Sequence, residues 1–115
     1  MTGSSATGRK ILESAAPLLK RVVLEMGGKD PMIVFEDADL EKAAKDAVQY
    51  SLCNTGQVCC SIERIYAAES IYDQFQQFAK KYAAEYKVGN GMDPENKVGP
   101  LVSRLQRDQV KEQVE

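Results

Sequence analysis

The sequence comprises 115 residues, of which 43% are hydrophobic and 28% are charged, with a formal net charge of −2. This length and composition predict one globular domain with a modest core. The small negative charge gives no electrostatic reason to bind nucleic acid or an anionic membrane, and no apolar run approaches the ~20 residues that cross a bilayer. We therefore expect neither nucleic acid nor a membrane as a partner.

The cysteine and histidine content limits the metal and redox chemistry of the chain. Because the sequence has no histidine, a Cys/His metal site within the chain is excluded and we expect no metal. The three cysteines, Cys53, Cys59 and Cys60, do not make a disulfide framework. The first ten residues lack the apolar core of a signal peptide, so the default expectation is a reduced, cytoplasmic protein.

The N-terminal third of the sequence predicts a helix followed by two buried strands. A turn of small and polar residues at 3–8 precedes apolar residues at helical spacing, and Pro17 ends or bends that helix. Residues 22–24 and 32–35 are short apolar runs of the kind found in buried strands. The two glycines at 27–28 separate them with a turn that other residues resist.

The middle of the sequence predicts a helix and a third strand. Apolar residues over 40–52 lie on one face of a helix, for which Asp37 or Asp39 could be the N-cap. After a loop that contains the paired cysteines, residues 64–68 form another strand candidate.

The C-terminal part predicts two further helices and an ordered loop. Ser70 with Asp73 resembles a capping box that opens a helix, residues 88–100 are dense in turn formers, and residues 103–115 have helical spacing. Alternating strands and helices favour an α/β fold with a mainly parallel sheet. Because the glycine turn at residue 3 needs a strand before it, we expect the chain to be an internal piece of a longer protein.

The first motif with chemical potential is GSSATGRK, at residues 3–10. It fails the ATP-binding loop pattern, which needs a lysine directly after the second glycine and then Ser or Thr. What remains is the start of a helix, where free N–H groups and the helix dipole favour an anion. A plain helix cap explains the same residues.

Two further motifs offer a base and a nucleophile. LEMGGKDP, at residues 24–31, places Glu25 at a predicted strand end, where ligands bind in open α/β sheets. Glu25 could act there as a general base, or be a solvated strand-end glutamate. GQVCCS, at residues 56–61, follows a glycine turn with Cys59 and Cys60, either of which could be a thiolate nucleophile or an inert core residue.

Taken together and in this order, the motifs resemble those of the aldehyde dehydrogenase superfamily along essentially the whole chain. The family runs F-T-G-S-x-x-x-G, L-E-L-G-G-K-x-P, N-x-G-Q-x-C and G-D-P-x-D-P-x-x-x-x-G-P-L, and this sequence gives MTGSSATG, LEMGGKDP, NTGQVC and GNGMDPENKVGPL. The resemblance implies a Rossmann-like parallel sheet with flanking helices, as part of the aldehyde dehydrogenase fold. Residues 1–26 would be the C-terminal part of the NAD(P)-binding domain, and residues 27–115 the N-terminal part of the catalytic domain.

The resemblance also assigns roles to individual residues. Cys59 matches the family's nucleophile, Cys60 is its non-catalytic neighbour, and Glu25 matches the general base. The positions that match the cofactor-binding residues are Gly3, Ser4, Thr7, Gly8 and Met26. The implied reaction oxidises a small aldehyde to a carboxylic acid with NAD or NADP, through a thiohemiacetal and then a thioester on Cys59. The full-length parent is implied to be a homo-oligomer, a dimer or a tetramer.

Three alternatives stay open beside the dehydrogenase interpretation. The isolated chain could be a catalytically inactive fragment, or a structural or partner-binding relative on the same scaffold. A thiol–disulfide protein built on Cys59 and Cys60 is a third possibility, although the pair lacks the C-x-x-C spacing.

Overall fold

A computed structural model describes all residues of the chain, 1–115. Strands alternate with helices through the middle of the chain, and a helix lies at either end. The helices are α1 (Ser5–Ala15), α2 (Leu40–Leu52), α3 (Tyr72–Ala83) and α4 (Arg104–Val114). The strands are β1 (Asp30–Val34) and β2 (Ile62–Ala67), and short 3₁₀ turns are η1 (Ala16–Leu18), η2 (Cys53–Gly56) and η3 (Glu69–Ile71).

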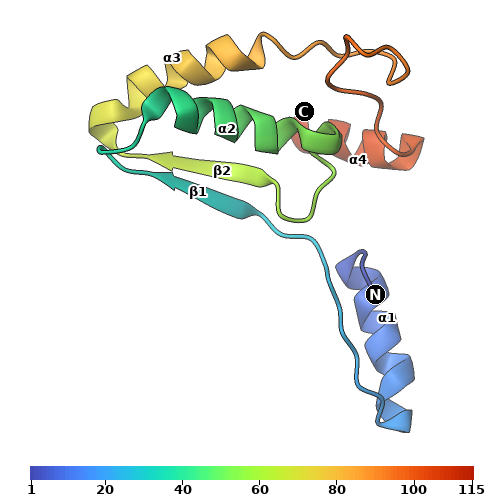
Figure 1. The fold of residues 1–115 in the computed structure, drawn as a ribbon. Helices are drawn as coiled ribbons and strands as arrows, with labels where there is room; N and C mark the ends of the chain where they lie inside the picture. Colours follow the sequence, from blue (N-terminus) through green and yellow to red (C-terminus); the bar gives the residue numbers. More distant parts are fainter.

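The centre of the fold is a β–α–β unit. Strands β1 and β2 pair in parallel, with Ile33 opposite Tyr66 and Val34 opposite Ala67. Because parallel neighbours need a crossover connection, α2 carries the chain from one strand to the other. Figure 1 shows α2 and α3 on the same side of this sheet. The predicted α/β class and the parallel pairing are confirmed.

The hydrophobic core lies where α2 and α3 cover the sheet. Val34 of β1 is buried together with Ala44 and Ala47 of α2, Ile71 of η3 and Phe75 of α3. The two alanines have no measurable exposed surface. The small alanine side chains on the inner face of α2 leave space that the Phe75 ring fills, so the interface between α2 and α3 is closely packed.

The opposite face of the sheet is uncovered, and the whole chain is correspondingly open. Ile33 and Phe35 are 63% and 68% exposed. The radius of gyration is 18.0 Å, whereas a compact domain of this length has about 13 Å. Only 8 of the 115 residues are buried. The buried core therefore holds the β1–α2–β2–α3 unit together. The segments outside this unit are held in place mainly by hydrogen bonds.

The N-terminal segment stands apart from this unit. In Figure 1, α1 lies away from the sheet, and an extended stretch connects it to β1. The strand predicted over 22–24 is not formed as a ladder: the only pairing in this region is a single parallel bridge between Thr2 and Glu25. Two hydrogen bonds flank this bridge, from Glu25 N–H to Met1 O (2.8 Å) and from Gly3 N–H to Glu25 O (3.0 Å). The prediction of a strand over 22–24 is wrong, because a strand requires consecutive paired residues and here Glu25 alone is paired.

The structure decides two predictions about helix starts. Asp39, not Asp37, caps α2, since its side chain accepts a hydrogen bond from Lys42 N–H. The capping box at Ser70 is wrong: Ser70 Oγ donates instead to Glu36 Oε1 at 2.6 Å. Helix α3 begins after η3, at a position without a side-chain cap.

The C-terminal segment brings α4 back to the cysteine loop. Residues 88–100 form an ordered loop as predicted, with a bridge between Val88 and Val98. Ser103 caps the predicted C-terminal helix, α4, by accepting from Gln106 N–H. Val102, shortly before α4, donates its N–H to the side chain of Gln57 in the cysteine loop. None of the helices has the length and apolar composition required to span a membrane.

Candidate active site

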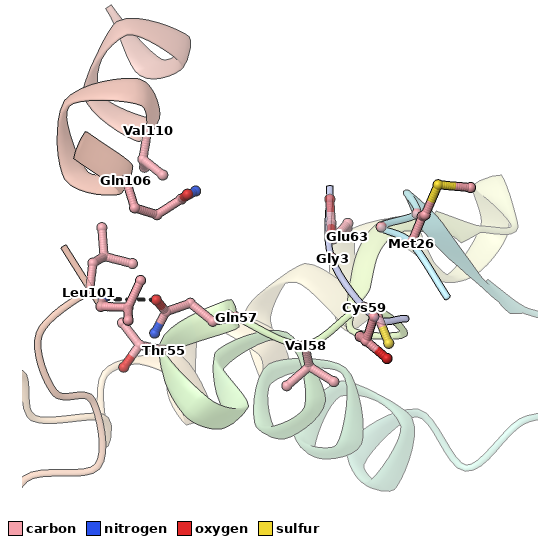
Figure 2. A pocket seen from close by; sticks show the side chains of 15 residues that line it. Gly3, Met26, Thr55, Gln57, Val58, Cys59, Glu63, Leu101, Gln106 and Val110 are labelled. Carbon is pink, nitrogen blue, oxygen red and sulfur yellow. Dashed lines mark hydrogen bonds between the residues drawn. The ribbon is translucent and has the colours of Figure 1, made fainter. Parts of the chain in front are cut away.

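One cavity joins segments that are far apart in the sequence. It has a volume of about 710 Å³ and lies between the N-terminal segment, the cysteine loop and α4. Figure 2 shows Cys59 and Met26 on one side and the α4 residues on the other. The lining residues are Thr2, Gly3, Met26, Gly27, Gly28, Thr55, Gly56, Gln57, Val58, Cys59, Glu63, Leu101, Val102, Gln106 and Val110.

The cavity distinguishes the two adjacent cysteines. Cys59 lines it and Cys60 does not. All three cysteines of the chain are unpaired and exposed, so neither Cys59 nor Cys60 is a core residue in this structure. The Cys59 N–H donates to no backbone acceptor. The cysteine that faces the cavity therefore presents both a thiol and a free N–H donor.

A left-handed turn directs the chain towards Cys59. Asn54, Thr55 and Gly56 have φ values of 50°, 62° and 72°. Left-handed backbone is ordinary for glycine, tolerated by asparagine and costly for a β-branched residue such as threonine. Three such residues in succession end α2 abruptly, and Gln57 and the residues after it run along the cavity.

The double-glycine turn packs against the cysteine loop. A β-carbon placed on Gly28 would lie 3.4 Å from the backbone oxygen of Cys59 and 2.7 Å from Asp30 Oδ2. At the second distance the Asp30 carboxylate would have to move, because β-carbons essentially never come closer than 3.0 Å to other atoms. The second and third motifs of the sequence are therefore in contact through their backbones.

Glu25 lies next to this cavity and does not line it. Its backbone is paired with the N-terminal residues, and its side chain is exposed. The next residue, Met26, is part of the lining. The structure thus places the Glu25 carboxylate on the solvent side of the segment that carries Met26.

Most of the predicted cofactor-binding turn serves as the start of α1. Ser4 Oγ accepts from Thr7 N–H at 3.2 Å, and the Ser4 and Thr7 hydroxyls are 3.0 Å apart. Gly8 is buried against Met26, whose Sδ would be 2.9 Å from a β-carbon on Gly8. Among the five predicted cofactor-binding residues, only Gly3 and Met26 line the cavity.

The sequence did not identify the wall that α4 contributes. Gln106 and Val110 are one helical turn apart and face the cavity, together with Leu101 and Val102 from the preceding loop. The i, i+4 spacing of Gln106 and Val110 indicates that they share one face of a helix, but it does not indicate which part of the chain that face contacts. Glu63 was missed as well; it lines the cavity and forms an ion pair with Lys29.

Comparison with known proteins decides the family. The sequence model of the aldehyde dehydrogenase family matches residues 1–115. The chain belongs to the aldehyde dehydrogenase family. A mitochondrial aldehyde dehydrogenase of Leishmania tarentolae is 50% identical over 110 residues, which are 95% of this chain and 22% of that protein. The chain thus spans less than a quarter of the length of this relative.

Solved aldehyde dehydrogenase structures confirm the fold. The betaine aldehyde dehydrogenase of Staphylococcus aureus, solved in complex with NAD⁺, matches with a TM-score of 0.93 at 36% identity, over 99% of this chain and 23% of that one. An NADP-dependent enzyme of Escherichia coli matches with a TM-score of 0.93 at 36% identity, over 98% of this chain and 24% of that one. The prediction of a partial aldehyde dehydrogenase fold is confirmed.

Proposed function

We propose that this aldehyde dehydrogenase chain supplies the nucleophile and the general base for oxidation of a small aldehyde to a carboxylic acid with NAD⁺ or NADP⁺. The observation that carries the proposal is the position of Cys59: its side chain lines a cavity shared with Gly3 and Met26, from which Cys60 is excluded. Two related proteins support the cofactor class: one was solved in complex with NAD⁺, and the other is described as NADP-dependent.

The first step assigned to the chain is attack by the Cys59 thiolate on the aldehyde carbon. The new C–S bond turns the carbonyl into a thiohemiacetal, and the negative charge moves to its oxygen. Hydrogen-bond donors aimed at that oxygen stabilise the transition state. The Cys59 N–H, which donates to no acceptor of the chain, is assigned this role. A thiolate is the reactive form of the nucleophile, and the base assigned to take the thiol proton is Glu25.

The residues near the N-terminus fit a dinucleotide cofactor. In the first turn of α1, the N–H groups of Ser5 and Ala6 have no intrahelical acceptor, and helix N-termini favour phosphate groups. The close contact of Gly8 with Met26 joins this turn to the cavity wall. A nicotinamide bound there would supply the acceptor for the hydride that leaves the thiohemiacetal carbon, so that a thioester remains on Cys59.

Glu25 is assigned the role of base. Its carboxylate is exposed next to the segment that lines the cavity, so it has access to water. It takes a proton from a water molecule, whose oxygen attacks the thioester carbon on Cys59. The C–S bond breaks, the carboxylic acid leaves, and the Cys59 thiolate is regenerated. General-base assistance of this kind contributes roughly 10²–10⁴-fold to a rate.

We extend the proposal to domains and assembly. Residues 1–26 would belong to the NAD(P)-binding domain and residues 27–115 to the catalytic domain of the whole protein. The separation of α1 from the β1–α2–β2–α3 unit in Figure 1 supports this division. The exposed face of the sheet, with Ile33 and Phe35, supports further packing partners, because parallel sheets are normally covered on both faces. A homo-oligomer, dimer or tetramer, is proposed from the family resemblance.

The test is a turnover assay on the protein that carries this chain, with NAD⁺ or NADP⁺ and a panel of small aldehydes. Cys59→Ser is expected to reduce formation of NADH or NADPH to background. Glu25→Gln should slow deacylation by about 100-fold or more, so that an acyl group accumulates on Cys59 and is seen by mass spectrometry. Cys60→Ser is the matched control and should retain the wild-type rate.

Two results would overturn the proposal. One is an equal loss of turnover in Cys60→Ser and Cys59→Ser, since only Cys59 lines the cavity and only its loss should abolish the reaction. The other is an unaltered steady state in Glu25→Gln without an acylated intermediate, which would assign the base to another residue.

A further inference from the structure

We propose that Gln57 is a positioning residue, whose carboxamide clamps the cysteine loop to the segment that leads into α4. The inference rests on the proposed function insofar as Cys59 is the nucleophile. The clamp itself is a set of hydrogen bonds that can be measured without substrate or cofactor.

Gln57 uses both ends of its carboxamide. Its Oε1 accepts from Val102 N–H at 2.9 Å, across 45 residues of sequence. Its Nε2 donates to Asn54 O at 3.1 Å, to which the Gln57 N–H also donates, at 3.2 Å. Asn54 Nδ2 returns a hydrogen bond to Gln57 O at 3.2 Å. The dashed line in Figure 2 marks the bond to Val102, which spans the cavity wall.

The turn that this clamp closes is conformationally costly. Left-handed backbone is unfavourable for an L-residue, above all a β-branched one, and Thr55 adopts it with φ 62°. Such conformations persist where the surroundings over-determine them. Here the surroundings are the Asn54–Gln57 hydrogen bonds and a bond from Thr55 Oγ1 to Gly99 O at 3.3 Å. Both connections to the segment that precedes α4 therefore start from this turn.

The clamp joins two walls of the cavity. Gln57 stands two residues before Cys59, and Val102 stands between Leu101 and the start of α4. Beyond Cys59, the Gly28 backbone limits movement of the loop from the other side. Without the carboxamide, the turn could relax and α4 would lose its hydrogen-bonded tie to the loop. Gln57 thus orients Cys59 and fixes the cavity width without touching a reacting atom.

The wild-type chain provides the first test, by amide hydrogen exchange followed by NMR. Val102 N–H should exchange about tenfold or more slowly than Leu101 N–H, its neighbour, which donates to no acceptor in the structure. In Gln57→Ala and in Gln57→Met, which keeps most of the side-chain volume, this protection should disappear. Gln74→Ala, an exposed position on α3, is the control and should leave it unchanged.

The second test is the ratio of Cys59 to Cys60 labelling by iodoacetamide within the same molecule. A general loss of stability affects both thiols, so a change of the ratio reports the orientation of Cys59. The ratio should differ from the wild-type value in both Gln57 variants and stay at that value in Gln74→Ala.

Each outcome decides the inference. Equal exchange of Val102 and Leu101 in the wild-type chain overturns the clamp, whether or not the variants fold. Loss of Val102 protection with an unchanged labelling ratio overturns the positioning role. Absence of aldehyde turnover in the whole protein would instead overturn the proposed function and leave the measured clamp standing.

Discussion

The α-carbon of Gly28 lies directly against the peptide that carries Cys59: a β-carbon at Gly28 would be 3.4 Å from the Cys59 oxygen and 2.7 Å from Asp30 Oδ2. At the adjacent Gly27, a β-carbon would meet no atom within 4 Å. Neither glycine has a positive φ. Comparing an alanine substitution at Gly28 with one at Gly27 therefore isolates the effect of the close contact, because neither position requires a left-handed backbone.

Gly28→Ala is expected to destabilise the chain relative to Gly27→Ala by about 0.5–1.5 kcal/mol, the usual cost of forcing a side chain such as that of Asp30 off its preferred rotamer. Both substitutions restrict the unfolded chain equally, so their difference isolates the contact with Asp30 and the cysteine loop. Urea unfolding of the two variants measures it. Equal midpoints and equal slopes would contradict the contact.

The contact between α1 and the cavity wall predicts a coupling between two residues. A methyl group on Gly8 would stand 2.9 Å from Met26 Sδ and 3.4 Å from Leu24 Cδ1. Gly8→Ala should therefore be more favourable in a Met26→Ala background, by about 1 kcal/mol in a double-mutant cycle. Gly8→Ala paired with Leu18→Ala, an exposed residue beyond the C-terminal end of α1, is the control cycle and should show additivity.

The left-handed turn predicts an unusual order of stabilities at position 55. Thr55→Ala loses the bond to Gly99 O and keeps the cost of positive φ, so we expect a loss of about 1 kcal/mol in unfolding free energy. Thr55→Gly loses the same bond but removes that cost, so it should be more stable than Thr55→Ala by about 1 kcal/mol. An alanine variant that is the more stable of the two would show that the turn is not left-handed in solution.

A charged group that ties α3 to α2 predicts a specific acid dependence. Hydrogen bonds from Lys81 and Tyr82 hold the pKa of Glu41 below its usual value of 4.5. A carboxyl whose pKa is lower in the folded state contributes stability above its unfolded pKa and loses it as pH falls. The partner has the opposite sign: the hydrogen bond to Glu41 raises the pKa of Lys81, whose contribution is lost as pH rises through that raised value.

Glu41→Gln should therefore flatten the decline of unfolding free energy below pH 4.5. Denaturant unfolding at several acidic pH values measures this slope. Glu13→Gln, an exposed position on α1 without a hydrogen-bond partner, serves as the matched control and should keep the wild-type slope. A parallel shift of both variants would assign the acid dependence to net charge rather than to Glu41.

The sequence determined the local structure because its signals are local. Alternating apolar segments gave the β–α–β order, and Ser4, Asp39 and Ser103 cap the helices as side-chain acceptors do at helix starts. The spacing of four short motifs identified the family. Where a signal needed a partner from elsewhere in the chain, sequence reasoning failed: Ser70 bonds to Glu36 rather than capping α3.

The tertiary structure decided how these elements meet. It separated Cys59 from Cys60 by placing only the first on the cavity, and it added the α4 wall at Gln106 and Val110. It also showed Gln57 reaching Val102, 45 positions away. A motif shows which residue types follow one another along the chain. A contact over 45 residues depends instead on how the helices and turns between the two partners pack. Such contacts are properties of the folded chain as a whole, because no single segment contains both partners.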